Sequence, residues 1–102
     1  GARNRPFMSD SESAWQQRGF RVRGRVQGVG FRWWTQRRAS DLGLRGTVGN
    51  HPDGTVEIHA AGDVETLEAL ATALEAGPPM AQVDGVDSFR SDGSLPTHFE
   101  II

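Results

Sequence analysis

Apolar and polar residues alternate along several stretches of the chain, and in two others the apolar positions recur every three or four residues. Phe20, Val22 and Val26, for example, alternate with arginines. Alternation with a period of two is typical of a strand with one buried face, whereas the longer spacing is typical of a helix. The expected strands cover residues 20–26, 44–49, 55–60, 83–89 and 97–102. The expected helices cover 31–42 and the segment from the N-cap Asp63 to the stop at Gly77-Pro78-Pro79.

The order of these elements predicts an α+β fold of the ferredoxin-like, split-βαβ type. A β-α-β-β-α-β order with a short terminal strand indicates an antiparallel sheet with two helices on one face. Its first and third strands are expected to be parallel central neighbours. Residues 45–60 are expected to form a hairpin around a turn at 51–54, and Gly85 to mark a bulge. Because this fold hosts enzymes, metal carriers and RNA-binding modules, it does not by itself indicate a function.

The ends of the periodic region predict the domain boundaries. Residues 1–18 are polar and lack periodicity, so we expect a disordered extension followed by one domain over 19–102. Met8 followed by a serine-rich run resembles a natural start, which would make Gly1–Phe7 a remnant of an expression vector. The chain has no cysteine, no apolar run of roughly 20 residues and no recognisable leader, so the expected location is the cytoplasm.

The formal net charge of −2 hides an uneven distribution. Residues 1–45 hold ten arginines and three acidic residues, whereas residues 46–102 hold one arginine and ten acidic residues. Such an asymmetry is compatible with a nucleic-acid-binding face, and equally with basic and acidic strands that lie side by side. RNA-binding sheets also need aromatic residues for base stacking, and here the alternating positions are arginines. Cross-strand pairing, for example with Glu57, is therefore the favoured interpretation.

A glycine-rich junction between the first strand and the first helix is the strongest chemical signal. Glycines let the backbone turn sharply and gather several N–H groups, and the start of a helix adds further free N–H groups. Arg32 adds a fixed, forked cation. Together these features predict a cradle for a phosphate or carboxylate. The expected binding residues are Gln27, Gly28, Val29, Gly30, Phe31 and Arg32.

Asn50, at the end of the second strand, is the second candidate site residue. The predicted sheet brings this strand end near the glycine-rich loop, so that Asn50 could face the anion cradle. An amide offers both donor and acceptor atoms and can orient a water molecule. The alternative is an asparagine that only tolerates the left-handed geometry next to a turn.

These residues resemble the acylphosphatase family. The run VRGRVQGVGFR over residues 22–32 resembles the first signature of that family. The run GTVGN over 46–50, followed by Gly54, Val56 and Gly62, resembles the second. The resemblance covers about residues 20–102, including Phe99-Glu100-Ile101 near the end. Thr47 and Gly49 depart from the family pattern, and because they flank Asn50 we expect them to loosen it or to alter substrate preference.

The resemblance implies hydrolysis of a small acyl phosphate to a carboxylate and inorganic phosphate. Arg32 and the 27–32 loop would hold the phosphoryl group, and Asn50 would orient the attacking water. Such phosphoryl transfer depends on positioning and electrostatic stabilisation, and its carboxylate leaving group needs no strong general acid. No cofactor or metal is expected. Phosphate would inhibit competitively as the product, and the protein is expected to be a monomer that binds neither a membrane nor nucleic acid.

Purely structural interpretations of the same residues, and two rival functions, remain open. Gly28 and Gly30 could form an ordinary tight turn, and Arg32 a surface salt bridge. Of the adjacent Trp33 and Trp34, at most one can be well buried, and the other could line the mouth of the site or cover the edge of the sheet. The rival functions are an acylphosphatase-like module that binds an anion without turnover and a small RNA-binding domain.

Overall fold

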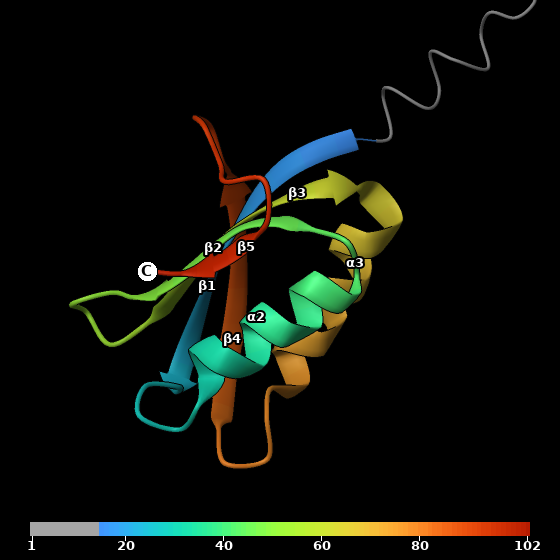
Figure 1. Cartoon of the computed structure of the whole chain (residues 1–102). Helices are drawn as coiled ribbons and strands as arrows, with labels where there is room; N and C mark the ends of the chain where they lie inside the picture. The colour runs from blue at the N-terminus through green and yellow to red at the C-terminus, as the bar shows by residue number, and fades with distance from the viewer. Residues whose placement is uncertain (1–14) are drawn as a thin grey trace, which may run out of the picture.

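The computed structural model describes residues 15–102, which form two helices packed on one face of a five-stranded sheet (Figure 1). The elements are β1 (Trp15–Arg25), α2 (Phe31–Asp41), β2 (Arg45–Asn50), β3 (Val56–Asp63), α3 (Val64–Ala76), β4 (Gln82–Arg90) and β5 (Phe99–Ile101). The predicted α+β, ferredoxin-like fold is confirmed, with every expected helix and strand present. In this part of the chain, neither helix is long and apolar enough to cross a membrane.

The strands lie side by side in the order β4-β1-β3-β2-β5. β1 pairs antiparallel with β3 and β4, and β3 pairs antiparallel with β2. The expectation that the first and third strands are parallel is therefore wrong. The strands that run in the same direction are β1 and β2, because the helix between them returns the chain to the same end of the sheet. β5 pairs parallel with β2, so the sheet is mixed and not entirely antiparallel.

Alternate residues of the central strands form a core beneath α2 and α3. The buried apolar side chains include Phe20, Val22, Val48, Val56 and Ile58 from the strands and Phe31, Leu67, Leu70 and Leu74 from the helices. Their removal from water is the main favourable contribution to the folding of so small a domain. Because Val48 and Phe31 are both part of this core, the start of α2 is held against the end of β2.

The first strand begins earlier than predicted. Residues 15–18, which we expected in a disordered extension, pair with β3, where Trp15 lies opposite Asp63. Periodicity gives no sign of this segment because its side chains remain wholly or partly exposed. The remainder of the expected extension, residues 1–14, lies outside the described residues.

Two predicted local features are confirmed. The hairpin between β2 and β3 is closed by the His51 N–H, which donates to the Thr55 carbonyl at 2.9 Å, and by the Gly54 N–H, which donates to the His51 carbonyl at 3.0 Å. The pairing of β1 with β4 shifts register between Arg23 and Gly24, next to the bulge expected at Gly85. Both features lie at the ends of strands, where they leave the central pairing intact.

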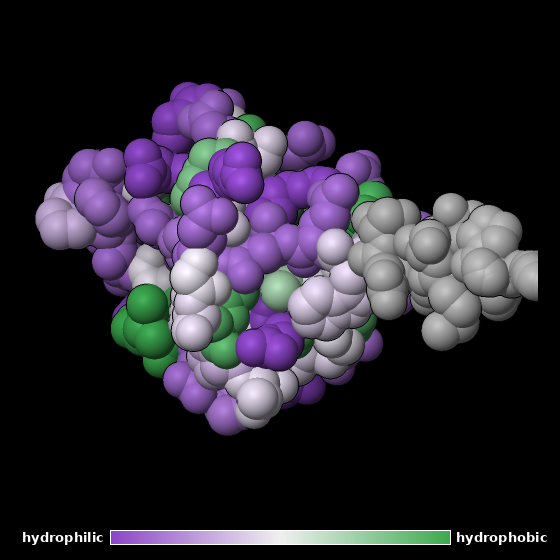
Figure 2. Space-filling view, turned by 90° about the horizontal axis from the view of Figure 1, so that it is seen from above, coloured by the Kyte–Doolittle hydropathy of each residue, from purple (hydrophilic) through white to green (hydrophobic). Residues whose placement is uncertain are grey.

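The face of the sheet away from the helices carries paired charges. This open face includes Arg21, Arg23, Glu57, His59 and Asp87. Arg21 donates to Glu57 and Arg23 to Asp87, each at 2.8 Å. The favoured interpretation of this strand, cross-strand pairing, is therefore confirmed for these two arginines. The molecule seen from above has a mostly hydrophilic surface with small apolar areas (Figure 2).

Candidate active site

The glycine-rich loop joins the end of β1 to the start of α2. Gly28 and Gly30 have φ angles of 77° and 79°, a conformation that side-chain-bearing residues rarely adopt. Gly30 is the N-cap of α2, and no side chain caps this helix. The first bond of the helix runs from the Trp34 N–H to the Gly30 carbonyl at 3.0 Å. The N–H groups of the preceding turn have no helical acceptor, and they are available to an anion.

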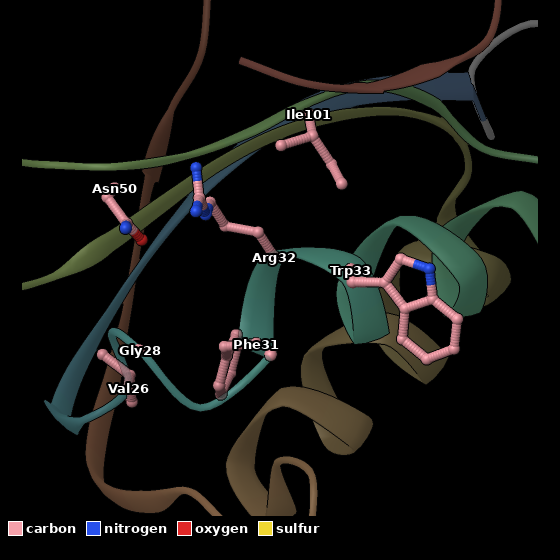
Figure 3. Close-up of a pocket in the computed structure, with 8 residues that line it drawn as sticks. Val26, Gly28, Phe31, Arg32, Trp33, Asn50 and Ile101 are labelled. Carbon is pink, nitrogen blue, oxygen red and sulfur yellow. The ribbon is translucent and has the colours of Figure 1, made fainter.

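Arg32 extends from the first turn of α2 toward Asn50 (Figure 3). Its side chain is exposed, and within residues 15–102 no carboxylate forms an ion pair with it. The first turn of α2 also lacks an acidic residue. Positive charge from the guanidinium and from the helix N-terminus therefore accumulates at one place without a counterion from the described chain.

Asn50 lies opposite Arg32 because of the strand register. It pairs with Val56 and is two residues from Val48, so its side chain is on the face of the sheet that carries the helices. β1 and β2 run in the same direction with β3 between them. The loop after β1 and the last residue of β2 therefore lie at the same end of the sheet. The predicted proximity is thus correct, although the strand pairing from which we predicted it is wrong.

A pocket of about 190 Å³ connects these features. Its lining residues are Val26, Gly28, Gly30, Phe31, Arg32, Trp33, Asn50 and Ile101. The structure therefore brings together four of the six expected loop residues with Asn50. The two others, Gln27 and Val29, do not line the pocket. A volume of this size accommodates a phosphoryl group with a small substituent.

The side chain of Gln27 makes contacts that the sequence did not predict. Its side-chain amide donates to the carbonyls of His51 and Thr55, at 2.8 and 2.9 Å. These two residues flank the hairpin turn directly after Asn50. Gln27 thus links the loop that would hold the anion to the turn that carries Asn50. Sequence reasoning missed this role, because spacing along the chain does not indicate which backbone carbonyls a glutamine reaches.

The hairpin turn is further stabilised by a charged group. The Asp53 carboxylate accepts hydrogen bonds from the side chain and the backbone N–H of Thr55, at 2.6 and 2.9 Å. These bonds, the side-chain one first, lower the pKa of Asp53 below its ordinary value of 3.8. The turn next to Asn50 is therefore held by an ionised carboxylate at neutral pH.

The family model for acylphosphatases matches residues 18–101. The chain belongs to the acylphosphatase family. It is 51% identical over 88 residues to an acylphosphatase of Nitratidesulfovibrio vulgaris, covering 83% of this chain and 88% of that protein. It is 45% identical over 80 residues to an acylphosphatase of Archaeoglobus fulgidus, covering 78% and 90% of the two chains. Membership confirms the predicted enzyme class, a hydrolase of acyl phosphates.

Solved structures of acylphosphatases have the same architecture. The acylphosphatase of Coxiella burnetii superimposes with a TM-score of 0.83 at 32% identity, covering 89% of this chain and 96% of that chain. The acylphosphatase of Bacillus subtilis gives a TM-score of 0.75 at 39% identity, covering 84% and 97%. The mixed five-stranded sheet is therefore the fold of this family.

The two departures from the family pattern are not at the acylphosphatase pocket. Thr47 pairs with His59 and Gly49 with Glu57, so both belong to the open face, whereas Asn50 faces the helices. A Cβ atom at Gly49 would come within 2.8 Å of the side chain of Ile102. Gly49 therefore makes room for the C-terminal residue, and the expectation that these two positions loosen Asn50 or alter substrate preference stays a prediction.

Proposed function

We propose that Arg32 and the backbone N–H groups at the start of α2 hold the phosphoryl group of the substrate, while Asn50 orients the attacking water. The observation that carries this proposal is the placement of Arg32 and Asn50. They extend toward one another across one pocket (Figure 3), from two elements that meet at one edge of the sheet. Neither side chain forms a hydrogen bond or ion pair with another described residue, so both are available to a ligand.

The reaction follows from these positions. A water oxygen held by the Asn50 amide attacks phosphorus, the bond between phosphorus and the acyl oxygen breaks, and its electron pair leaves with the carboxylate. The water proton is lost to solvent or to a phosphate oxygen, and inorganic phosphate remains. The carboxylate is a stable leaving group, so positioning and charge stabilisation are sufficient without a strong general acid.

The electrostatics of the pocket suit the transition state. The negative charge on the phosphoryl oxygens grows near Arg32 and the free N–H groups, which are fixed before the reaction begins. Preorganised donors of this kind stabilise charge at little reorganisation cost. Because they already supply positive charge, we propose that the reaction proceeds without a metal and that phosphate inhibits by occupying the same cradle.

A hydrolysis assay tests this proposal. Purified protein should convert acetyl phosphate to acetate and phosphate, with equal rates in excess EDTA and after added Mg²⁺. Inorganic phosphate should raise the apparent KM without changing kcat. Loss of turnover in EDTA, or phosphate inhibition that lowers kcat alone, would contradict the proposed binding mode. The rival function, an anion-binding module without turnover, predicts phosphate binding and no release of acetate.

The monomeric state and the cytoplasmic location stay predictions. Light scattering coupled to gel filtration should give one mass close to that of a single 11.1 kDa chain. Fractionation of cells that produce the protein at its natural level should recover the activity in the cytosol. A stable dimer, or activity in the membrane fraction, would contradict the respective prediction.

A further inference from the structure

The exposed side of α2 carries a second hollow, of about 390 Å³, beside the pocket that holds Arg32 and Asn50. The residues that line this α2 hollow are Trp33, Trp34, Arg37, Arg38, Asp41 and Leu42. Only Trp33 is shared with the first pocket. In Figure 3 the Arg32 guanidinium is directed toward Asn50, whereas the Trp33 indole lies away from Asn50. The two concavities therefore present different side chains, and the volume of the α2 hollow lies in the range of small-molecule sites.

Each arginine of the α2 hollow lies over the tryptophan one turn earlier in the helix. The Arg37 guanidinium is 4.9 Å from the centre of the Trp33 ring, and the Arg38 guanidinium is 5.2 Å from that of Trp34. Such stacking engages the flat face of a guanidinium and leaves the N–H groups around its edge free to donate. The two cations are therefore restrained before a ligand arrives, which lowers the entropy that binding would cost.

The carboxylate of the α2 hollow does not neutralise these arginines. Asp41 follows Arg37 by four residues and Arg38 by three, the spacings at which ion pairs form along a helix. Within residues 15–102, however, the ion pairs of arginines involve other positions, and neither Arg37 nor Arg38 takes part in one. The α2 hollow thus offers two guanidiniums and a carboxylate that form no ion pair with the described residues.

A purely structural explanation accounts for only part of this arrangement. A basic residue in the last turn of a helix, as Arg38 is, interacts favourably with the helix dipole. That effect does not require a tryptophan, and Trp33 leaves 58% of its surface open to solvent. Tryptophan and arginine are both enriched at recognition surfaces. Their combination here indicates a site for a ligand that is both aromatic and anionic.

A nucleoside phosphate has the groups that these side chains bind. Its base is planar and stacks on aromatic rings, its phosphate accepts hydrogen bonds from guanidiniums, and its ribose hydroxyls and base amino groups donate. We propose that the α2 hollow binds a nucleoside monophosphate, with the base against the exposed indole, the phosphate at the two guanidiniums and a hydroxyl or amino group donating to Asp41. The carboxylate favours a free nucleotide over a nucleic-acid strand, because it repels further phosphates. The site does not use the side chains of the proposed reaction, so it is a second binding function of this chain.

Calorimetric titration of the purified protein with adenosine monophosphate (AMP) tests the proposal. One AMP should bind per chain. Adenosine, which lacks the phosphate, and ribose 5-phosphate, which lacks the base, should each bind at least about tenfold more weakly. The same titration of Arg32→Ala should give the affinity of the wild type, because the AMP phosphate does not occupy the cradle at the start of α2. A failure of the proposed function is seen separately, in the turnover of that variant.

Matched variants assign the binding to the α2 hollow. Arg37→Ala and Arg38→Ala should each weaken AMP binding about tenfold, because a charge-assisted hydrogen bond to the phosphate is lost. Trp33→Ala should weaken it by a similar factor, whereas Trp33→Phe should keep it within about threefold, because a phenyl ring also stacks on a base. The control is Arg25→Ala, which removes an exposed arginine outside the α2 hollow and should leave the affinity unchanged.

Absence of AMP binding to the wild type would overturn the proposal. Loss of AMP binding in Arg32→Ala would do the same, since AMP would then occupy the first pocket. Unchanged affinity in both Arg37→Ala and Arg38→Ala would exclude the α2 hollow, even if Trp33→Ala did not fold. A single-stranded oligonucleotide that binds while AMP does not would identify a nucleic-acid-binding face and would also contradict a nucleotide site.

Discussion

Two arginines of this acylphosphatase, Arg21 and Arg32, show how one side-chain type has two uses in a small domain. Arg21, on the open face, donates to Glu57 at 2.8 Å and lies over the ring of Phe89 at 5.5 Å. Arg32, at the pocket, has no ion-pair partner within residues 15–102. The open-face arginine stabilises the fold, whereas the pocket arginine is left without a counterion and can bind a substrate anion.

The contrast extends to the groups around each arginine. On the open face, the Gln17 amide donates to the Ser91 hydroxyl at 3.1 Å, so that hydroxyl is free to donate to His59 Nδ1 at 2.6 Å. His59 Nε2 then carries the proton and donates to Glu57 at 2.8 Å. These hydrogen bonds connect a serine, a histidine and a glutamate. Ser91 is nevertheless only 5% exposed, so its hydroxyl cannot reach a substrate. Ser91, His59 and Glu57 each find a hydrogen-bond partner within the fold.

The largest expected effect separates the two arginines. Arg32→Ala should lower kcat/KM for acetyl phosphate by at least about 10²–10³-fold, because a preorganised donor to the phosphoryl group is lost. Its melting temperature should stay near that of the wild type. Arg21→Ala is the matched control, and it should lower the melting temperature while keeping turnover. A reversal of these two patterns would invalidate the comparison.

Asn50→Ala should have a similar effect on turnover through a different step. The water would no longer be oriented, so kcat should fall by about 10²-fold or more. The affinity for phosphate should change little, since the cradle and Arg32 are intact. Steady-state kinetics with phosphate as inhibitor measure both quantities. Wild-type kcat in this variant would leave Asn50 as a residue that only flanks a turn.

Gln27→Ala tests whether the link between the loop and the hairpin positions the site. Loss of two hydrogen bonds to His51 and Thr55 should lower kcat about tenfold, because small misplacements of reacting groups are costly. Gln27→Glu should not restore kcat, since a carboxylate cannot donate hydrogen bonds to these carbonyls. Gln16→Ala, on the exposed start of β1, is the control. Equal activity of all these variants would show that the link is not needed.

The smallest expected effect concerns pH and the open face. The hydrogen bond from Arg21, followed by that from His59, lowers the pKa of Glu57 below its ordinary value of 4.5. A carboxylate with a lowered pKa in the folded state contributes stability above its ordinary pKa, and this is lost as the pH falls through the folded value. Glu57→Gln should therefore lower the free energy of unfolding by less than about 1 kcal/mol at neutral pH. It should also make the loss of stability toward acid pH less steep.

Urea unfolding between pH 7 and pH 3 measures that difference, with Glu75→Gln on the exposed side of α3 as the control. The Glu57 variant should keep the turnover of the wild type at pH 7. An acid limb as steep in Glu57→Gln as in the wild type would show that this carboxylate is not the group that titrates.

The same contrast explains what the sequence could predict. The strand alternation, the helix stripes and the glycine loop before Arg32 are local patterns, and each is present in the structure. Strand direction and partners are not local, so the parallel pairing of the three-residue β5 was not predicted. The contacts of the Gln27 side chain depend on which distant backbone carbonyls lie beside it. The open-face position of Thr47 and Gly49 follows from the strand register, since proximity in sequence to Asn50 does not give a shared face.

The most direct test of the account measures the inhibition constant of phosphate alongside kcat in Arg32→Ala and Asn50→Ala. If Arg32 binds the phosphoryl group and Asn50 orients water, both variants lose turnover. Phosphate inhibition should then weaken strongly in Arg32→Ala and change by less than about twofold in Asn50→Ala. Wild-type turnover in both variants, or an equal loss of phosphate inhibition in both, would contradict the division of roles between these two residues.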